Sequence, residues 1–217
     1  MGFLEKNHIL FDLDGTLTDP AEGITRSVQH ALAGFGLNAS REELLCFIGP
    51  PLADSFVKYF GFTEEASLRA VSVYREYFAE KGIFENRVYP GIPELLKRLR
   101  SQGKQLYLAT SKPEVFARRI LAHFQLDKYF TFAGGSCLDG TRVRKGEVVR
   151  YVLEQAGIPP GDAVMVGDRE HDALGASEMG IPCVGVLYGY GDQSELEQAG
   201  VAAIAEDLAA LEKILIN

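Results

Sequence analysis

The spacing of hydrophobic residues changes along the chain, and each change predicts a different kind of element. Residues 8–13, "HILFDL", form a short apolar run typical of a buried strand. From about residue 19 to residue 81, apolar positions recur at helical spacing. The first predicted helix there carries Ile24, Val28, Ala31, Leu32 and Phe35. From residue 91 onward, short apolar runs alternate with amphipathic stretches, which predicts strands alternating with helices.

The alternating part predicts a parallel sheet. Its apolar runs fall at residues 104–111, 129–135, 163–168 and 182–187. Continuous apolar strands separated by amphipathic helices are typical of a parallel sheet covered on both faces. We therefore expect an α/β fold, with a doubly wound, Rossmann-like core domain formed by residues 1–17 and 87–217. Residues 18–86 would form an inserted α-helical domain.

Local signals place several helices of the insertion. Asp19-Pro20 followed by Glu22 predicts a helix with Asp19 as its N-cap, Pro20 as its first residue and Glu22 reaching back. Two further helices are expected around "IGPPL", residues 48–52, and another over residues 64–82.

The composition is that of an ordinary soluble globular protein, with 217 residues, 47% hydrophobic residues and a formal net charge of -8. No Lys/Arg-rich block offsets this charge, so we expect no nucleic-acid partner. Cys46, Cys137 and Cys183 form no C-x-x-C pair, which favours free thiols in a reducing compartment. No apolar run reaches the roughly 18 residues of a membrane span, and the first residues do not resemble a secretory segment. We expect a cytoplasmic protein without a membrane partner, as a monomer or weak homodimer.

Polar side chains follow several of the predicted strands at the point where each strand ends. They are Asp12 and Asp14 after the first strand, Thr110, Ser111 and Lys112 after the second, Lys145 at the helix that follows the third, and Asp168 and Asp172 after the fourth. In an open parallel sheet, ligands bind beyond the carboxyl ends of the strands. We therefore expect these side chains to converge at one edge of the sheet.

The paired acids indicate the chemistry of this edge. Because a strand alternates its side chains between faces, Asp12 and Asp14 are expected to point to the same side and lie together. Two adjacent carboxylates need a compensating cation, a shared proton or strong donors. Phosphoryl transfer to a carboxylate meets the same problem, because two like unit charges 4 Å apart repel by about 4 kcal/mol at an effective dielectric near 20. A magnesium ion held by Asp12 and Asp168 would reverse this repulsion. Lys145 and the Thr110 hydroxyl would then bind the phosphoryl oxygens.

Four stretches resemble, in order, the four motifs of the haloacid dehalogenase superfamily. They are "DLDGTLTD", "LATSK", the lysine of "RKGE" and "GDREHD". The likeness is greatest to its phosphoglycolate phosphatase-like branch, in which a helical cap is inserted between the first and second motifs. It extends over nearly the whole chain, including "GVLYGYG". The resemblance implies a haloacid dehalogenase-like core with a cap domain, and a Mg²⁺-dependent phosphatase that forms an aspartyl-phosphate.

The resemblance also implies roles for the four acids. Asp12 would be the nucleophile, and Asp14 the general acid that protonates the leaving oxygen and then the base that activates water. Asp12, Asp14 and Asp168 would hold Mg²⁺. Asp172 would support the metal or the lysine.

The phosphoryl group would be bound by Thr110, Ser111 and Lys145. Two features depart from the family pattern, since the fourth motif reads Gly-Asp-Arg where relatives often have Gly-Asp-Ser, and the third has Lys-Gly where many have Lys-Pro. Arg142 or Arg144 therefore stays an alternative to Lys145 as the cation that binds phosphate.

The expected substrate is a small soluble phosphorylated metabolite, phosphoglycolate by resemblance. Gly49, Pro50 and Pro51 form the stretch of the cap expected to face it. A nucleotide or sugar-phosphate phosphatase and a β-phosphoglucomutase-like phosphomutase are alternatives that use the same machinery. Two non-enzymatic functions stay open as alternatives, a phospho-receiver and a catalytically silent binding protein. The long insertion and the acid at Asp14 argue against a receiver, which must retain its phosphate.

Overall fold

The computed structural model describes residues 3–216, which form two compact units. The core unit comprises the described residues up to Thr18 and those from Val88 onward, and the helical unit comprises Asp19–Arg87. Two short strands, β2 (Thr18–Asp19) and β3 (Arg87–Val88), pair with each other where the chain passes between the units.

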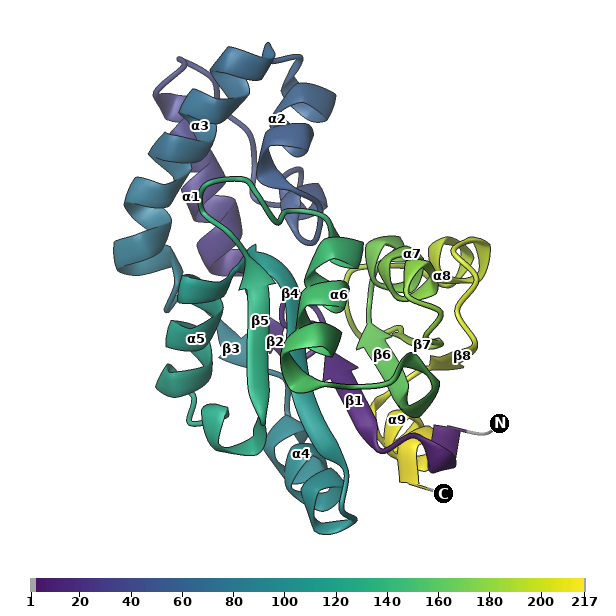
Figure 1. Ribbon diagram of the computed structural model, residues 1–217. Coiled ribbons are helices and arrows are strands. Elements are labelled where there is room, and N and C mark those ends of the chain that lie inside the picture. Colours follow the sequence, from purple (N-terminus) through teal and green to yellow (C-terminus); the bar gives the residue numbers. More distant parts are fainter. Residues whose placement is uncertain (1–2, 217) are drawn as a thin grey trace. The chain divides into compact units, whose positions relative to one another are not determined.

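The core unit is built on a six-stranded parallel sheet with the strand order β5-β4-β1-β6-β7-β8 (Figure 1). The strands are β1 (His8–Phe11), β4 (Gln105–Pro113), β5 (Phe132–Ser136), β6 (Ala163–Gly167), β7 (Cys183–Val186) and β8 (Ala203–Ala205). β1 is central, because its His8 pairs with Gln105 of β4 on one side and Ala163 of β6 on the other. The carboxyl ends of β1, β4 and β6 therefore lie next to one another.

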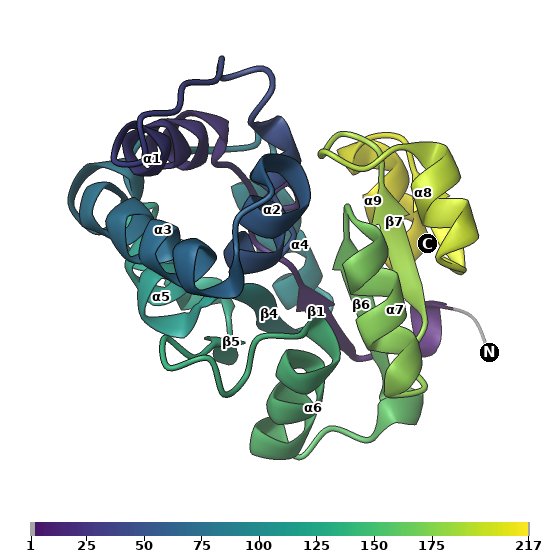
Figure 2. The same cartoon turned by 90° about the horizontal axis from the view of Figure 1, so that it is seen from above.

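Helices cover both faces of this sheet. The α-helices are α4 (Ile92–Ser101), α5 (Glu114–His123), α6 (Lys145–Ala156), α7 (Glu170–Glu178), α8 (Gln193–Gln198) and α9 (Leu208–Ile216). Short 3₁₀ turns lie at Phe3–Glu5, Asp127–Tyr129 and Pro160–Asp162. Figure 2 shows α6 and α7 on one face and α4 and α9 on the other. The parallel α/β fold expected from the continuous apolar strands is thus confirmed.

The packing beneath α6 and α7 shows why the strands are apolar throughout. Leu10 of β1 and Met165 of β6 are fully buried there against Val148 and Val152 of α6. Phe11, the neighbour of Leu10 in β1, is also fully buried. Successive residues of a strand point to opposite faces, so both faces of the sheet are in the core.

The helical unit consists of α1 (Ala21–Ala33), a 3₁₀ turn (Leu45–Phe47), α2 (Leu52–Phe60), α3 (Glu64–Tyr77) and a π-helical turn (Phe78–Gly82). Aromatic rings form much of its packing, and Phe47 and Phe56 lie with ring centroids 5.0 Å apart. Of the helices expected around "IGPPL", the one that precedes it is only a 3₁₀ turn. The helix expected over residues 64–82 ends in π form. The six-residue helix α8, with Leu196 as its buried residue, was not predicted.

The start of α1 differs from the prediction by one residue. The helix begins at Ala21, so Pro20 occupies the N-cap position. Asp19 accepts a hydrogen bond from the Ala21 N–H at 3.1 Å, a contact two residues along the chain that is typical of an aspartate turn. Glu22 pairs with Arg26 instead of reaching back.

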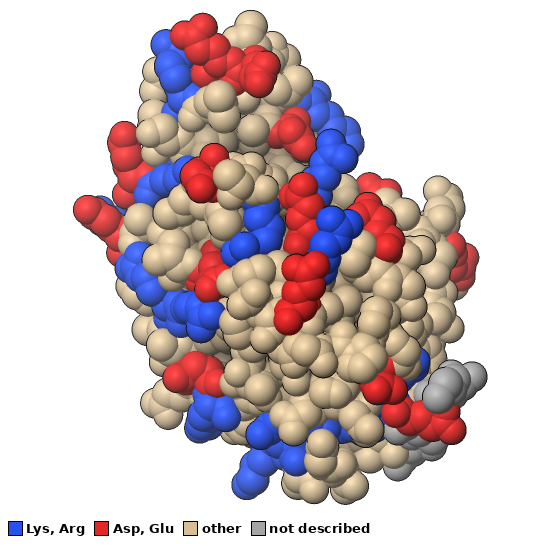
Figure 3. All heavy atoms as spheres, viewed as in Figure 1, with Lys and Arg blue, Asp and Glu red and all other residues tan. Residues whose placement is uncertain are grey.

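Charged side chains of both signs are interspersed on the face of the molecule drawn in Figure 3, where neither sign forms a large continuous area. Among residues 3–216, no helix has both the length and the apolar character needed to cross a membrane.

Candidate active site

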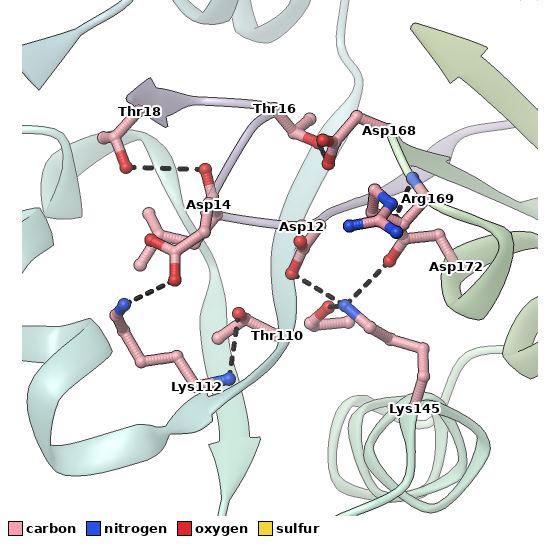
Figure 4. A network of polar contacts seen from close by, with 12 residues as sticks. Asp12, Asp14, Thr16, Thr18, Thr110, Lys112, Lys145, Asp168, Arg169 and Asp172 are labelled. Atoms are coloured by element: carbon pink, nitrogen blue, oxygen red, sulfur yellow. Dashed lines mark hydrogen bonds and ion pairs between the residues drawn. The ribbon is translucent and has the colours of Figure 1, made fainter. Parts of the chain in front are cut away.

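Asp12 and Asp14 follow β1 in a tight turn. The strand ends at Phe11, so strand alternation does not place the two acids, contrary to the sequence argument. The turn is closed by hydrogen bonds from the Leu17 N–H to the Leu13 carbonyl at 2.9 Å and from the Gly15 N–H to the Thr18 carbonyl at 2.8 Å. Both acids are buried, with exposed fractions of 6% and 8%, and each faces a different lysine (Figure 4).

Lys145 is the cation beside Asp12. It is the first residue of α6, and its Nζ lies 2.7 Å from Asp12 Oδ1, 2.8 Å from Asp172 Oδ1 and 3.0 Å from the Ala109 carbonyl oxygen. These three acceptors match the three donors of a lysine. Burial opposes the charge of Lys145, but the Asp12 and Asp172 carboxylates outweigh burial and raise its pKa above the ordinary value.

Neither arginine considered as an alternative to Lys145 is placed beside Asp12. The Arg142 Nε donates to the Gly135 carbonyl at 2.8 Å, and the guanidinium lies 3.6 Å from the centre of the Tyr151 ring. Arg144 is exposed and precedes α6.

Lys112 is the cation beside Asp14; the sequence placed it at this edge of the sheet but gave it no catalytic or binding role. Its Nζ forms an ion pair with Asp14 Oδ2. Burial raises the pKa of Asp14, and the charge of Lys112 opposes this shift. Asp14 Oδ1 is also buried and has no hydrogen-bond partner among the described residues.

Asp168 follows β6 and is fully buried. Its Oδ1 accepts from the Thr16 hydroxyl at 3.2 Å, and its Oδ2 accepts from the Tyr190 N–H at 2.8 Å. Burial raises the pKa of Asp168 well above its ordinary value, and the nearby charges of Asp172 and Asp12 add to the shift. The sequence did not indicate Thr16 or Tyr190, although Tyr190 belongs to the quoted stretch "GVLYGYG".

The remaining predicted residues are divided between the two units. Asp172, in the first turn of α7, accepts a hydrogen bond from the Arg169 N–H at 3.1 Å in addition to its ion pair with Lys145. Thr110 is buried near the end of β4, where its hydroxyl accepts from the Lys112 N–H at 3.2 Å, and Ser111 is half-buried. Gly49, Pro50 and Pro51 lie in the helical unit between its 3₁₀ turn and α2.

The acids fit a hard divalent cation. Asp12, Asp168 and Asp172 each offer a carboxylate oxygen within 4.8 Å of the others. The Asp14 carboxylate is not in this group, because it turns to Lys112. The site holds four buried carboxylates and two lysines that pair with three of them, so a divalent cation such as Mg²⁺ would balance the charge and use the oxygen ligands that it prefers.

Known proteins share both the sequence and the fold. A 5'-nucleotidase of Pseudomonas aeruginosa is 51% identical over 209 residues, which cover 96% of this chain and 95% of that protein. The tyrosine-protein kinase PtkA of Mycobacterium tuberculosis is 39% identical over 90% of this chain and 67% of its own length. Phosphoglycolate phosphatase 1 of P. aeruginosa is 32% identical over 94% of this chain and 77% of its own length.

A solved structure described as a predicted phosphatase from Clostridium acetobutylicum has the same fold. It superposes with a TM-score of 0.94 at 47% identity, covering 96% of this chain and 97% of that one. The family model for haloacid dehalogenase-like hydrolases matches residues 9–186, a range that spans β1 to β7 and includes all four buried acids. The chain therefore belongs to the haloacid dehalogenase-like hydrolase family.

Proposed function

We propose that this hydrolase is a phosphatase that cleaves a small phosphomonoester through an aspartyl-phosphate intermediate. The observation that carries the proposal is the geometry around Asp12. A buried carboxylate is held by Lys145 through one oxygen, next to a second acid, Asp14, whose Oδ1 has no partner among the described residues. This arrangement provides a fixed nucleophile and a separate group that exchanges protons.

In the first half of the reaction, an Asp12 oxygen attacks the phosphorus atom of the substrate. The bond between phosphorus and the ester oxygen breaks, and Asp14 gives its proton to that oxygen, so the alcohol leaves neutral. Burial of Asp14 favours the protonated form that this step needs. The products are the free alcohol and a phosphoryl group bonded to Asp12.

In the second half, Asp14 takes a proton from water as the water oxygen attacks the same phosphorus. The bond to Asp12 breaks, inorganic phosphate leaves, and both acids return to their starting states. Lys145 and Thr110 are the proposed contacts of the phosphoryl oxygens. Because Lys145 already has three acceptors, a phosphoryl oxygen would replace one of them.

Asp12, Asp168 and Asp172 are the residues that we propose hold Mg²⁺ together. The sequence prediction included Asp14 in this set, and the carboxylate geometry favours Asp172 in its place. When bound, Mg²⁺ supplies positive charge beside the phosphoryl group and so reduces its repulsion from the carboxylates. The protein itself fixes the acids, and Thr16 and Tyr190 hold both oxygens of Asp168.

For the substrate, we propose a nucleoside 5'-monophosphate, with phosphoglycolate as the second candidate. The relative named 5'-nucleotidase is 51% identical over nearly its whole length, whereas the relative named phosphoglycolate phosphatase 1 is 32% identical. We also propose that the helical unit is the cap that selects the leaving group, through Gly49, Pro50 and Pro51.

The test is phosphate release from a panel of nucleoside 5'-monophosphates, phosphoglycolate and sugar phosphates, with Mg²⁺ and with EDTA. Asp12→Asn is the matched control, because it keeps the shape of the side chain and removes the nucleophile. We expect Mg²⁺-dependent release that is greatest with a nucleoside monophosphate and is lost in the variant. Release by Asp12→Asn at the wild-type rate would contradict the mechanism. Transfer of phosphate between sugar positions without release would indicate a phosphomutase.

A further inference from the structure

Lys112 and Asp14 form a buried pair that leaves one carboxylate oxygen available. The two side chains are 6% and 11% exposed, and the ion pair involves only Oδ2 of Asp14. Oδ1 of the same carboxylate is buried without a hydrogen-bond partner among the described residues. Figure 4 shows Lys112 reaching Asp14 from β4, on the opposite side of Asp12 from Lys145. The carboxylate is therefore held at one oxygen, and the other is left for a ligand.

The backbone of β4 is irregular at the residues that position Lys112. β4 and β5 pair regularly up to Thr110 and Gly135, and the next pair is Pro113 with Ser136, so β4 carries two extra residues in the bulge. Inside the bulge, the Lys112 N–H donates to the Thr110 hydroxyl at 3.2 Å. Bulges redirect side chains next to active sites, and this one directs Lys112 toward Asp14.

The neighbouring strand accommodates this bulge through a glycine. A Cβ atom on Gly135 would lie 2.6 Å from the Lys112 carbonyl oxygen and 2.7 Å from the Glu114 Cα, both backbone atoms that have no freedom to rotate away. A larger residue at position 135 would therefore displace the segment that carries Lys112. The position of the lysine depends on the backbone of two strands.

We propose that Lys112 is a positioning residue for the reaction described above: it fixes Oδ2 of Asp14 so that Oδ1 is presented to the oxygen of the leaving group. This inference rests on the proposed phosphatase function. In the first half-reaction, the proton on Oδ1 moves to the ester oxygen as the phosphorus–oxygen bond breaks. Lys112 keeps its own protons and does not contact the substrate. Fixing the acid in advance removes the need to orient it during the reaction.

Substrates with different leaving groups distinguish a positioning role of Lys112 from a structural or a substrate-binding role. An alkyl alcohol needs a proton to leave, whereas nitrophenolate leaves without one. Loss of acid positioning should therefore slow the cleavage of an alkyl phosphate and have little effect on nitrophenyl phosphate. A lysine that supports only the fold would affect both substrates alike, and a lysine that binds substrate would change KM.

The experiment compares wild type, Lys112→Met and Lys112→Arg in a rapid-mixing assay of the first turnover with Mg²⁺. The first turnover is measured because hydrolysis of the aspartyl-phosphate is common to all substrates. The two substrates are nitrophenyl phosphate and the alkyl phosphate that wild type hydrolyses best. Lys104→Met is the matched control, since Lys104 is a buried lysine whose Nζ donates to the Lys6 carbonyl at 2.9 Å.

For Lys112→Met we expect the alkyl phosphate rate to fall on the order of 10²-fold, within the range of general acid catalysis, with a change below about 3-fold for nitrophenyl phosphate. KM should stay within about 3-fold for both substrates, because the lysine does not bind them. Lys112→Arg should recover most of the alkyl rate, and Lys104→Met should match wild type. Gly135→Ala keeps the charges and should reproduce part of the alkyl-specific loss by moving the bulge.

Other results would overturn the inference. Equal losses with both substrates would assign Lys112 a purely structural role, and a raised KM would make it a substrate contact. Wild-type rates in Lys112→Met would contradict the positioning role of Lys112 and leave the phosphatase proposal intact. If wild type released no leaving group from any phosphomonoester, the proposed function would fail and the inference with it.

Discussion

Lys145 Nζ lies 2.7 Å from Asp12 Oδ1, and this buried ion pair joins the first residue of α6 to the residue that follows β1. Both side chains are less than a tenth exposed. The pair positions the proposed nucleophile and places a positive charge where an anionic phosphoryl group must approach. Its contributions to catalysis and to stability are separable by experiment.

Replacing Lys145 with Met should abolish turnover and destabilise the core unit at neutral pH. Removing one partner of a buried ion pair typically costs about 3–5 kcal/mol, because the carboxylates that remain are uncompensated. Mild acid should restore part of this stability, since burial raises the pKa of Asp172 and its protonation then removes part of the repulsion. Urea unfolding at neutral and mildly acidic pH measures both effects, with Lys104→Met as the control for loss of a buried lysine. A loss of stability that did not depend on pH would contradict this account.

Asp168 should make stability depend on pH when divalent cations are removed. Its pKa is raised above the ordinary value by burial and then by Asp172 and Asp12, so the folded state holds a proton that the unfolded state has already lost. The folded state therefore loses stability as pH rises from the ordinary value, about 3.9, to the raised one. The melting temperature in EDTA should fall over this window. Mg²⁺ at neutral pH should raise the melting temperature again.

Asp168→Asn is the control for that prediction. An asparagine can accept from the Tyr190 N–H and donate to the Thr16 hydroxyl, so the hydrogen bonds of Asp168 are preserved without the charge. The variant should show a smaller pH dependence in EDTA and a smaller response to Mg²⁺ than wild type. Equal pH profiles for the two proteins would show that Asp168 is not the titrating group.

Thr16→Val should weaken the response to Mg²⁺ without abolishing activity. The substitution preserves the shape of the side chain and removes the hydroxyl that donates to Asp168 Oδ1 at 3.2 Å. Loss of such a contact to a metal ligand typically weakens metal binding about 10- to 100-fold. Titration of phosphatase activity with Mg²⁺ gives the half-saturating concentration. Thr25→Val removes a buried hydroxyl that donates to the Ala21 carbonyl in the helical unit, and it should leave this concentration unchanged.

The elements of the fold could be predicted from the sequence only in part, and the reason is physical. Strands such as Ala163–Gly167 are buried at every position, which identifies a sheet covered on both faces. Short elements escaped detection, as α8 did, because six residues with a single buried Leu196 carry almost no periodic signal.

The acids of the site could be predicted because parallel strands bring their carboxyl ends together, and each acid follows its own strand or opens the next helix. The contacts of Lys112 with Asp14 and of Thr16 with Asp168 could not. Lys112 reaches Asp14 only through the two-residue bulge in β4, and Thr16 reaches Asp168 only through the turn after β1. Neither irregularity has a period that a sequence pattern reveals. The pairing of β4 with β5 sets the bulge, and hydrogen bonds among residues 13–18 close the turn.

Substitution of Gly15 would show whether the turn after β1 requires a glycine at the point where it approaches Asp168. Gly15 and Gly103 both have positive φ, at 85° and 81°, so alanine at either position should suffer similar backbone strain of about 1–2 kcal/mol. A Cβ on Gly15 would also overlap the Asp168 carboxylate, whereas a Cβ on Gly103 would meet nothing within 4 Å. Gly103→Ala should therefore lower the melting temperature and leave turnover unchanged.

Gly15→Ala should lower both the melting temperature and the turnover. It should also weaken the response to Mg²⁺ by about 10-fold or more, because the displaced carboxylate of Asp168 is one of the proposed metal ligands. Thermal unfolding and Mg²⁺ titrations of activity on the two variants separate strain from displacement. If both variants kept wild-type turnover and the same Mg²⁺ response, the approach of Gly15 to Asp168 would have no part in the reaction. A loss confined to Gly15→Ala would show that this turn needs a glycine to bring the backbone against Asp168, because the matched strain at Gly103 leaves the site intact.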